Sequence, residues 1–286
     1  MRWGITMLGI QDVLVGAFVI SMMVSVGSDL TWERLRAIVR RPRLLGGGLL
    51  AAYLCVPLAA WLLGTGLGLS AGLFAGLMLC AAAPGGPIGA LFTQRAGGNL
   101  ALSVSLLMAV NFINVLATPF TIQLLGVTPG DDIIIALLGM VGTILAFQIF
   151  PLVVGVQLRE RRPELAEKVG RWGRRVANLL LVGAIVGFGI SEADLFLQVD
   201  PRVLIAGEGV TLVAIVSGWL LVPGDRATKK AGAMSNAMRS QSLSILLAST
   251  QFSDPETLVA VLCFSILMFI NGLAAAEIFR RTMPED

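Results

Sequence analysis

The sequence predicts an all-α membrane protein that crosses the bilayer several times. Of its 286 residues, 56% are hydrophobic and only 14% are charged, whereas roughly a quarter of the residues are charged in ordinary soluble domains. The mean hydropathy is +0.85. The hydrophobic residues gather in runs of about 20, which is the length of helix that spans a hydrocarbon core about 30 Å thick.

Nine such runs predict nine transmembrane helices. The first is an uncleaved helix and not a signal peptide, because Asp12 interrupts its start and no small-residue cleavage site follows it. The third and the eighth contain Pro-Gly-rich or polar stretches, and the others are continuous. The predicted spans are residues 8–28, 44–64, 70–95, 99–126, 131–158, 173–192, 202–223, 228–250 and 255–279.

The basic residues predict the orientation of the chain. With the N-terminus outside and the C-terminus in the cytoplasm, all of the 21 Lys and Arg residues lie in cytoplasmic loops except Arg2, Arg202 and Arg239. Cytoplasmic loops are typically rich in these residues, so this topology is expected, in the cell inner (plasma) membrane. The same distribution accounts for the pI of about 9.0 without a nucleic-acid partner.

The third span contains a run of helix-breaking residues, Pro84, Gly85, Gly86 and Pro87. Proline lacks an N–H donor and clashes with the preceding turn, and glycine adopts backbone angles that other residues avoid. The helix should therefore break here, and the freed backbone groups must be buried in protein or line a watery cavity. A half-helix N-terminus at such a break suits an anion. The alternative is a kink that only shapes packing.

The eighth span contains "MSNAMRSQSLSILLAST", residues 234–250, in which Asn236, Arg239, Ser240 and Gln241 interrupt the apolar pattern. No Pro or Gly marks a break, so the alternative is a continuous helix with a polar face. An arginine near the middle of a span costs at least about 2.5–3.5 kcal/mol, which favours a functional role. It could instead snorkel to an interface or pair with Glu208 or Asp12.

The fourth and ninth spans share the pattern Phe-Ile-Asn-x-Leu-Ala, in residues 112–117 and 269–274. Each copy follows an interrupted span, and the two copies run in opposite directions across the membrane. Inverted repeats with discontinuous helices are typical of secondary transporters. The predicted repeats are residues 1–126, with spans one to four, and 127–286, with spans five to nine.

Residues 83–120, "APGGPIGALFTQRAGGNLALSVSLLMAVNFINVLATPF", resemble the bile acid:sodium symporter family. The stretches "VISMMVSVGSDL", "VPLAAWLLGTGLGLSAGLFAGLMLCAAAPGG" and "NAMRSQSLSILLAS" fit the same family pattern, so the resemblance covers nearly the whole chain. It implies a core domain of spans two, three, four, seven, eight and nine, with spans three and eight as crossing discontinuous helices. It also implies a panel domain of spans one, five and six, and organic anions as substrates.

The chain departs from this family where the resemblance places sodium ligands. Gly89 and Ala90 stand where a Ser-Asn pair is expected, Ser103 is kept, and Leu107 replaces a threonine. Ser235 and Arg239 stand in place of a glutamate and a glutamine, and Ala52 in place of a further glutamine. Neither crossing segment contains a carboxylate. The sequence thus suggests that the permanently charged guanidinium of Arg239 replaces a sodium ion, binds the anionic substrate, or does both.

Further substrate-binding candidates lie on the crossing spans and beside them. Asn111 and Asn114 share a helical face and could line a cavity or bond to the broken backbone, and the same two interpretations hold for Asn271. Met268 stands where some members of the family have a substrate-contacting histidine. The full set of candidates is Arg239, Asn236, Ser240, Gln241, Pro87, Ile88, Gly89, Asn111, Asn114, Met268 and Asn271.

The expected function is secondary transport of small organic anions by alternating access, without classical sodium coupling. The substrates would be carboxylates or sulfonates that resemble bile acids, pantoate or keto acids. One alternative is a conventional Na⁺/organic anion symporter using Ser103, Ser235 and Gln241; another is a non-transporting ligand sensor. Proton coupling would depend on Asp12 or Glu208. The chain has no His and no catalytic motif, which argues against an enzyme. No cofactor or metal is expected, and monomer and homodimer stay open.

Overall fold

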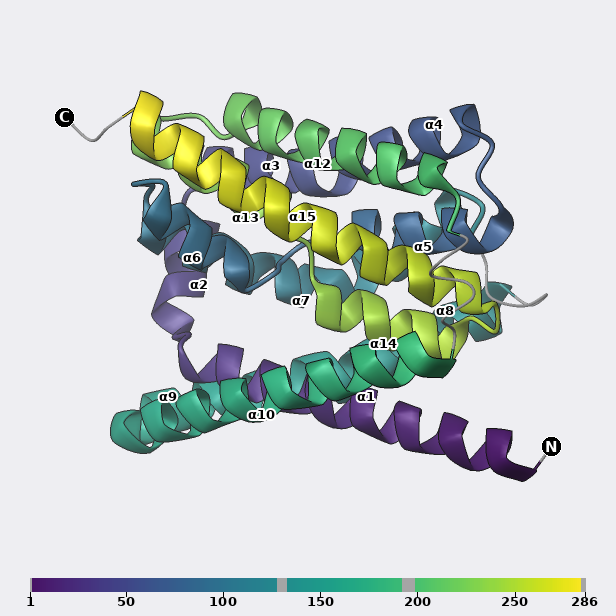
Figure 1. Cartoon of the computed structure of the whole chain (residues 1–286). Coiled ribbons are helices and arrows are strands. Elements are labelled where there is room, and N and C mark those ends of the chain that lie inside the picture. The colour runs from purple at the N-terminus through teal and green to yellow at the C-terminus, as the bar shows by residue number, and fades with distance from the viewer. Residues whose placement is uncertain (1, 128–132, 192–198, 284–286) are drawn as a thin grey trace.

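The computed structural model of the chain is helical throughout its described residues, which are 2–127, 133–191 and 199–283. Side chains are described for 13–127, 133–183 and 199–283. In chain order the α-helices are α1 (Arg2–Ser28), α2 (Trp32–Val39), α3 (Pro42–Leu50), α4 (Val56–Gly66), α5 (Ala71–Ala82), α6 (Ile88–Arg95), α7 (Leu100–Leu124), α8 (Ile133–Ile144), α9 (Phe150–Arg161), α10 (Pro163–Ser191), α12 (Pro201–Leu221), α13 (Arg226–Ala237), α14 (Gln241–Gln251) and α15 (Pro255–Thr282), as Figure 1 shows.

The described helices include enough long apolar segments for a multi-pass membrane protein. The segments long and apolar enough to cross a membrane are Pro42–Gly66, Leu100–Leu124, Ile133–Arg161, Pro201–Leu221 and Pro255–Thr282. A sixth is the pair Val13–Ser28 and Trp32–Val39, bent by 76°. The all-α membrane class is therefore confirmed. The number of nine spans stays a prediction, because the expected third and eighth spans are each divided into two short helices.

Two of the long segments contain a short π-helix directly ahead of a proline. The first, η1 (Ala51–Cys55), connects α3 to α4 before Pro57, and the second, η2 (Leu145–Ile149), connects α8 to α9 before Pro151. Proline cannot donate to the carbonyl four residues earlier and collides with it in a regular helix. The wider π-turn accommodates this mismatch, so each segment continues through its proline instead of breaking.

The helices pack in two groups. α1 packs against α9 and α10 at the bottom of Figure 1, whereas α12 packs against α4, α13 and α15 at the top. Glycines let α1 and α9 approach closely: a side chain on Gly155 would lie 2.8 Å from the amide of Ser28. Small residues at such contacts are typical of helix packing in membranes. We call α1, α8, η2, α9 and α10 the lower group and the remaining helices the upper group.

The two interrupted segments break where the sequence predicts, and the breaks meet. α5 ends at Ala82 and α6 begins at Ile88, while α13 ends at Ala237 and α14 begins at Gln241. The extended residues between them form an antiparallel bridge of Pro84 with Arg239. Its hydrogen bonds run from the amide of Gly86 to the carbonyl of Met238 (3.0 Å) and from the amide of Ser240 to that of Ala83 (2.7 Å).

The Gly-Gly pair in the first break has a specific geometric reason. Gly85 has φ of +95°, a conformation that residues with a side chain rarely adopt. A side chain on Gly86 would lie 3.0 Å from the carbonyl carbon of Arg239 and 3.1 Å from that of Met238. The missing side chain at Gly86 thus lets the two broken segments approach this closely, while Gly85 supplies the unusual backbone angle.

Candidate functional site

Four helix ends converge where the two broken segments cross. The C-terminal ends of α5 and α13 leave carbonyl groups without helical partners, and the N-terminal ends of α6 and α14 leave amides. The carbonyl ends carry partial negative charge and the amide ends partial positive charge. In this buried region the carbonyl ends therefore need cations or hydrogen-bond donors. The amide ends need anions or neutral acceptors.

The side chain of Arg239 supplies the cation for the carbonyl ends. It is only 1% exposed. Its Nε donates to the carbonyl of Cys80 (3.2 Å), and its Nη2 donates to the carbonyls of Ala81 and Ala52 (3.0 Å to Ala52). Its Nη1 lies 3.5 Å from the carbonyl and 3.4 Å from the Oδ1 of Asn236. The guanidinium thus connects the ends of α5 and α13 to η1.

All of these acceptors are neutral oxygens. Arg239 takes part in none of the ion pairs among the described residues, and Glu208 accepts instead from Asn271 (2.6 Å). The side chain of Asp12 lies outside the described residues. A set of neutral oxygens at negative helix ends is the environment in which proteins bind hard cations. The guanidinium occupies such an environment with its own permanent charge.

One face of α7 bonds to the first break. The Nδ2 of Asn114 donates to the carbonyl of Pro84 (2.9 Å), and Thr118 donates to the carbonyl of Ala82 (2.8 Å). The Nδ2 of Asn111 donates to its own helix at Leu107 (2.7 Å) and lies 3.5 Å from the carbonyl of Gly85. Asn111 and Asn114 are therefore placed against the broken backbone, as one of the two interpretations expected.

Each π-helix directs one polar side chain at this face of α7. The hydroxyl of Tyr53 in η1 donates to the Oδ1 of Asn114 (2.5 Å), and the Nε2 of Gln148 in η2 donates to the Oδ1 of Asn111 (2.7 Å). The sequence interpretation missed both residues. The available signal was a polar side chain in an apolar run, a few residues ahead of a proline.

A small cavity of about 20 Å³ lies beside the crossing. It has room for about one water molecule or a single ion and is too small for an organic anion. Ser103 lies 2.7 Å from Ser235 and 3.1 Å from Thr93 between their hydroxyl oxygens. The cavity is lined by Gly48, Ala52, Pro84, Gly85, Gly86, Gly89, Ala90, Ser103, Leu106, Leu107, Val110, Gly232, Ser235 and Asn236.

A larger cavity of about 190 Å³ lies between α1, α6, α7 and α10. Pro87 and Ala90, at the start of α6, line it together with apolar side chains of α1 and α7. Arg34 and Arg174 also line it. Arg174 pairs with Asp29 (2.5 Å), and Arg34 lies 3.3 Å from the carbonyl of Asp29. Two arginines and one aspartate leave a net positive charge, so this cavity suits an anion with an apolar body. We call it the interlayer cavity.

The remaining candidates lie near the crossing but make other contacts. The amide of Gln241 donates to the carbonyl of Ser265 on α15 (3.2 Å). The sulfur of Met268 accepts from the backbone amide of Arg239 (3.0 Å). The hydroxyl of Ser240 lies 3.5 Å from that of Ser242. Asn271, paired with Glu208, is not brought to the second break as Asn114 is brought to the first.

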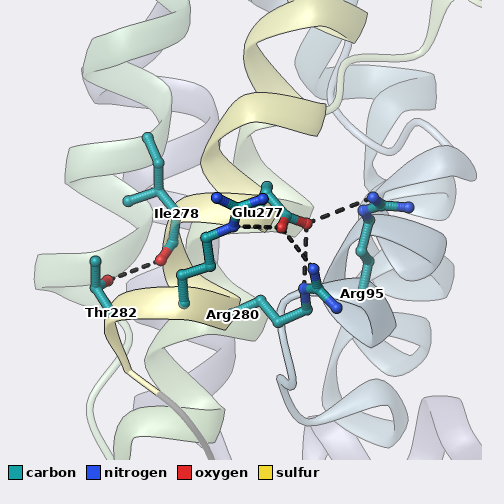
Figure 2. A network of polar contacts seen from close by, with 6 residues as sticks. Arg95, Glu277, Ile278, Arg280 and Thr282 are labelled. Atoms are coloured by element: carbon teal, nitrogen blue, oxygen red, sulfur yellow. Dashed lines mark hydrogen bonds and ion pairs between the residues drawn. The ribbon is translucent and has the colours of Figure 1, made fainter.

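Further charged residues hold the C-terminal ends of α6 and α15 and the start of α13. Figure 2 shows Glu277 of α15 between Arg95 of α6 (3.4 Å) and Arg280 (2.6 Å). The buried Lys230 donates to the carbonyl of Met283 (2.5 Å). Asp225 caps α13, and its hydrogen bonds with Thr228 hold the pKa of its carboxyl below the usual value.

The chain is also similar in sequence to proteins of a known family. Residues 17–197 match the Sodium Bile acid symporter family. The chain belongs to this family. In the family resemblance given by the sequence, the expected sodium-site positions are Ala52, Gly89, Ala90, Ser103, Leu107, Ser235 and Arg239. All except Arg239 line the small cavity, and Arg239 bonds to two residues of its wall, Ala52 and Asn236.

Several curated proteins of this family are similar over most of the chain. The "Probable sodium/metabolite cotransporter BASS2, chloroplastic" of Oryza sativa is 27% identical over 270 residues, which are 93% of this chain and 64% of that protein. The "Uncharacterized sodium-dependent transporter YocS" of Bacillus subtilis is 28% identical over 92% of this chain and 82% of its own length. The "Sodium-dependent organic anion transporter" of Mus musculus is 27% identical over 95% and 74%. The chain thus spans just under two thirds of the plant relative.

Proposed function

We propose that this chain is a secondary transporter of small organic anions that works by alternating access. The observation that carries the proposal is the crossing of two broken helices in a member of this family, beside a cavity with net positive charge. Relatives described as sodium/metabolite cotransporters and as an organic anion transporter support the same class. The substrate is a carboxylate or sulfonate with an apolar body.

We further propose nine spans in two inverted repeats, with the N-terminus outside and the C-terminus in the cytoplasm of the plasma membrane. The panel domain comprises spans one, five and six, and the core comprises the other spans. Support comes from the packing of α1 with α9 and α10, and from the two breaks that pair with each other. The arginines of the positive loops support the orientation.

Arg239 takes the place of a coupling sodium ion in this proposal. Support comes from its five contacts with neutral oxygens at the ends of two half-helices and at η1. A second cation near such a site is repelled: two unit charges 4 Å apart cost about 4 kcal/mol at an effective dielectric constant of 20. Transport is therefore expected without sodium coupling. Because Arg239 is 1% exposed, it acts on the crossing and not on the substrate directly in this conformation.

The interlayer cavity is the proposed place of the substrate. The N-terminal end of α6 directs partial positive charge at an anion, and Pro87 and Ala90 from this end line the cavity. Arg34 and Arg174 supply full positive charges at its charged end. The apolar side chains of Met22, Val26 and Val104 suit the hydrocarbon part of the substrate.

A conventional Na⁺/organic anion symporter is the second candidate. The observation that favours it is the group of hydroxyls of Thr93, Ser103 and Ser235 beside a cavity of about 20 Å³. The relatives from Bacillus subtilis and Mus musculus are both described as sodium-dependent. This candidate differs from the first in the response to sodium alone.

A thermal-shift screen of the purified protein tests both candidates. Each of a series of carboxylates and sulfonates is added with Na⁺ or with choline, because a ligand that binds the folded state raises its stability. Anions that stabilise the protein equally in both salts, and that enter proteoliposomes equally in both, fit the proposal. Uptake that requires Na⁺ supports the symporter. The absence of any stabilising or transported anion contradicts both.

A further inference from the structure

We propose that Gln148 and Thr143, on the lower group of helices, form the outer gate contacts that must break when the transporter opens on the side opposite Arg34 and Arg174. This inference rests on the proposed alternating access. It concerns a polar seam between the two groups that the sequence interpretation did not identify. Gln148 reaches Asn111 of α7, and Thr143 accepts a hydrogen bond from Gln251 of α14 (3.3 Å).

The contact of Gln148 with Asn111 links the lower group to the broken helix. Both side chains are 1% exposed. Asn111 in turn lies 3.5 Å from the carbonyl of Gly85 through its Nδ2. If η2 moves away from α7, Asn111 therefore loses its hydrogen bond from Gln148. Asn111 is the side chain that contacts the first break.

The hydrogen-bond pattern fixes the orientation of both amides. The Nδ2 of Asn111 donates to the carbonyl of Leu107 (2.7 Å), so its Oδ1 is the acceptor for Gln148. Gln148 must then present its Nε2, and its Oε1 is buried with no partner among the described side chains and backbone. An unpaired buried acceptor favours any arrangement that exposes it to water. Separation of the two groups would give this oxygen access to water, which favours opening of the contact.

Thr143 and Gln148 are five residues apart at the junction of α8 and η2. Residues five apart differ by about 140° around a regular α-helix, so they would point to different sides. The wider turn of a π-helix reduces this angle. Thr143 lies in the last turn of α8 and Gln148 lies within η2, and both reach helices of the upper group. Gly139, one turn before Thr143, lies on the same seam, because a side chain there would be 3.0 Å from the Oε1 of Gln251.

The seam and the interlayer cavity adjoin along α7. Leu107 lines that cavity, and Asn111 is the next residue along the same face of α7. Arg34 and Arg174 line the same cavity. In the proposed exchange of access, the seam separates when the cavity opens on the side away from these two arginines.

The test is the accessibility of a buried cysteine beside Thr143. Ile144 is 0% exposed, and Ile144→Cys is introduced into a protein whose Cys55, Cys80 and Cys263 are replaced by alanine. A membrane-impermeant maleimide is applied to vesicles of either orientation. Gln148→Ala removes the contact and leaves little apolar surface to expose, so we expect labelling from the side opposite Arg34 to rise at least fivefold. Gln148→Met keeps the bulk but exposes an apolar side chain on opening, so its labelling should fall below that of the parent.

Tyr53→Phe is the matched control. It removes a hydrogen bond to a neighbouring asparagine of α7, but Tyr53 and Asn114 both belong to the upper group. Its labelling should stay within about twofold of the parent. Equal labelling of the alanine variant and the parent overturns the inference, as does an equal rise in Tyr53→Phe. If Gln148→Ala fails to fold, labelling of Gln148→Met above that of the parent overturns the inference. Loss of anion uptake in all proteins, with the labelling order intact, contradicts the proposed function alone.

Discussion

Arg239 shows how a charged side chain is accommodated in the middle of an apolar segment without a carboxylate partner. Its donors meet carbonyl oxygens of Cys80, Ala81 and Ala52, which belong to backbone that a continuous helix would have paired internally. Lys230 of α13 makes the same kind of contact at the C-terminal end of α15, where it donates to the carbonyl of Met283. In both cases the cation satisfies carbonyl groups that a helix terminus leaves open.

The sequence could predict the position and importance of Arg239, because a charge in a span is costly and conspicuous. It could not predict the acceptors, since backbone carbonyls carry no signature in the sequence. Tyr53 and Gln148 were missed for a related reason: their partners, Asn114 and Asn111, lie on a helix far away in the chain.

At the residue scale, Asn114→Ala is expected to destabilise the protein more than Asn271→Ala. Loss of Asn114 leaves the carbonyl of Pro84 and the hydroxyl of Tyr53 without this partner in a buried region, at roughly 2–4 kcal/mol in total. Asn271 instead donates to the half-buried Glu208, so its loss should cost less. Melting temperatures of the two variants in one detergent provide the measurement, and equal losses would contradict the role of Asn114 in holding the break.

At the scale of elements, the sequence predicts the first break more clearly than the second. Pro84, Gly85, Gly86 and Pro87 cannot form a regular helix, so the first break could be predicted from local chemistry. The second has only polarity as a signal, so a continuous helix with a polar face is the alternative that the sequence leaves open. The hydrogen bond from the amide of Ser240 to the carbonyl of Ala83 decides for the break. The π-helices could not be predicted, because most prolines within helices produce kinks and not π-turns.

Gly86→Ala tests the closeness of the two broken segments. The added methyl group would lie 3.0 Å from the carbonyl carbon of Arg239, so the backbone must shift and the bridge weakens. We expect a lower melting temperature, with a loss of about 1–3 kcal/mol in stability. Gly142→Ala on α8 is the control, because outside the adjacent backbone of α8 no atom of the described residues lies within 4 Å of its added methyl group. A Gly86→Ala protein as stable as this control would show that the segments do not meet so closely.

At the scale of the whole molecule, composition predicted the membrane class, because only 14% of the residues are charged, against roughly a quarter in ordinary soluble domains. The arrangement of the helices into two groups required contacts between distant parts of the chain, such as the close approach of Gly27 and Gly155. The interlayer cavity was likewise missed. In the sequence, Arg34 and Arg174 look like ordinary basic residues of cytoplasmic loops. Only folding brings them to the same cavity.

Arg34→Ala is expected to weaken binding of the anionic substrate about tenfold, which corresponds to about 1.4 kcal/mol and is typical of losing one charge-assisted contact. The melting temperature without anion should change little, since Arg34 is exposed. Arg36→Ala, an exposed change on the same short helix α2 outside the cavity lining, is the matched control. Dissociation constants measured by titration calorimetry check the pair. Equal affinities for the two variants would place the substrate elsewhere.

The most direct test of the central claim is the melting temperature of the purified wild type and of Arg239→Gln as Na⁺ replaces choline at constant ionic strength. If Arg239 stands in for a sodium ion, the wild type should not respond to Na⁺. Arg239→Gln should melt several degrees lower in choline and regain part of this loss in Na⁺, because an ion that binds only the folded state stabilises it. A wild type that is stabilised by Na⁺, or an Arg239→Gln protein as stable as the wild type in choline, would contradict the account.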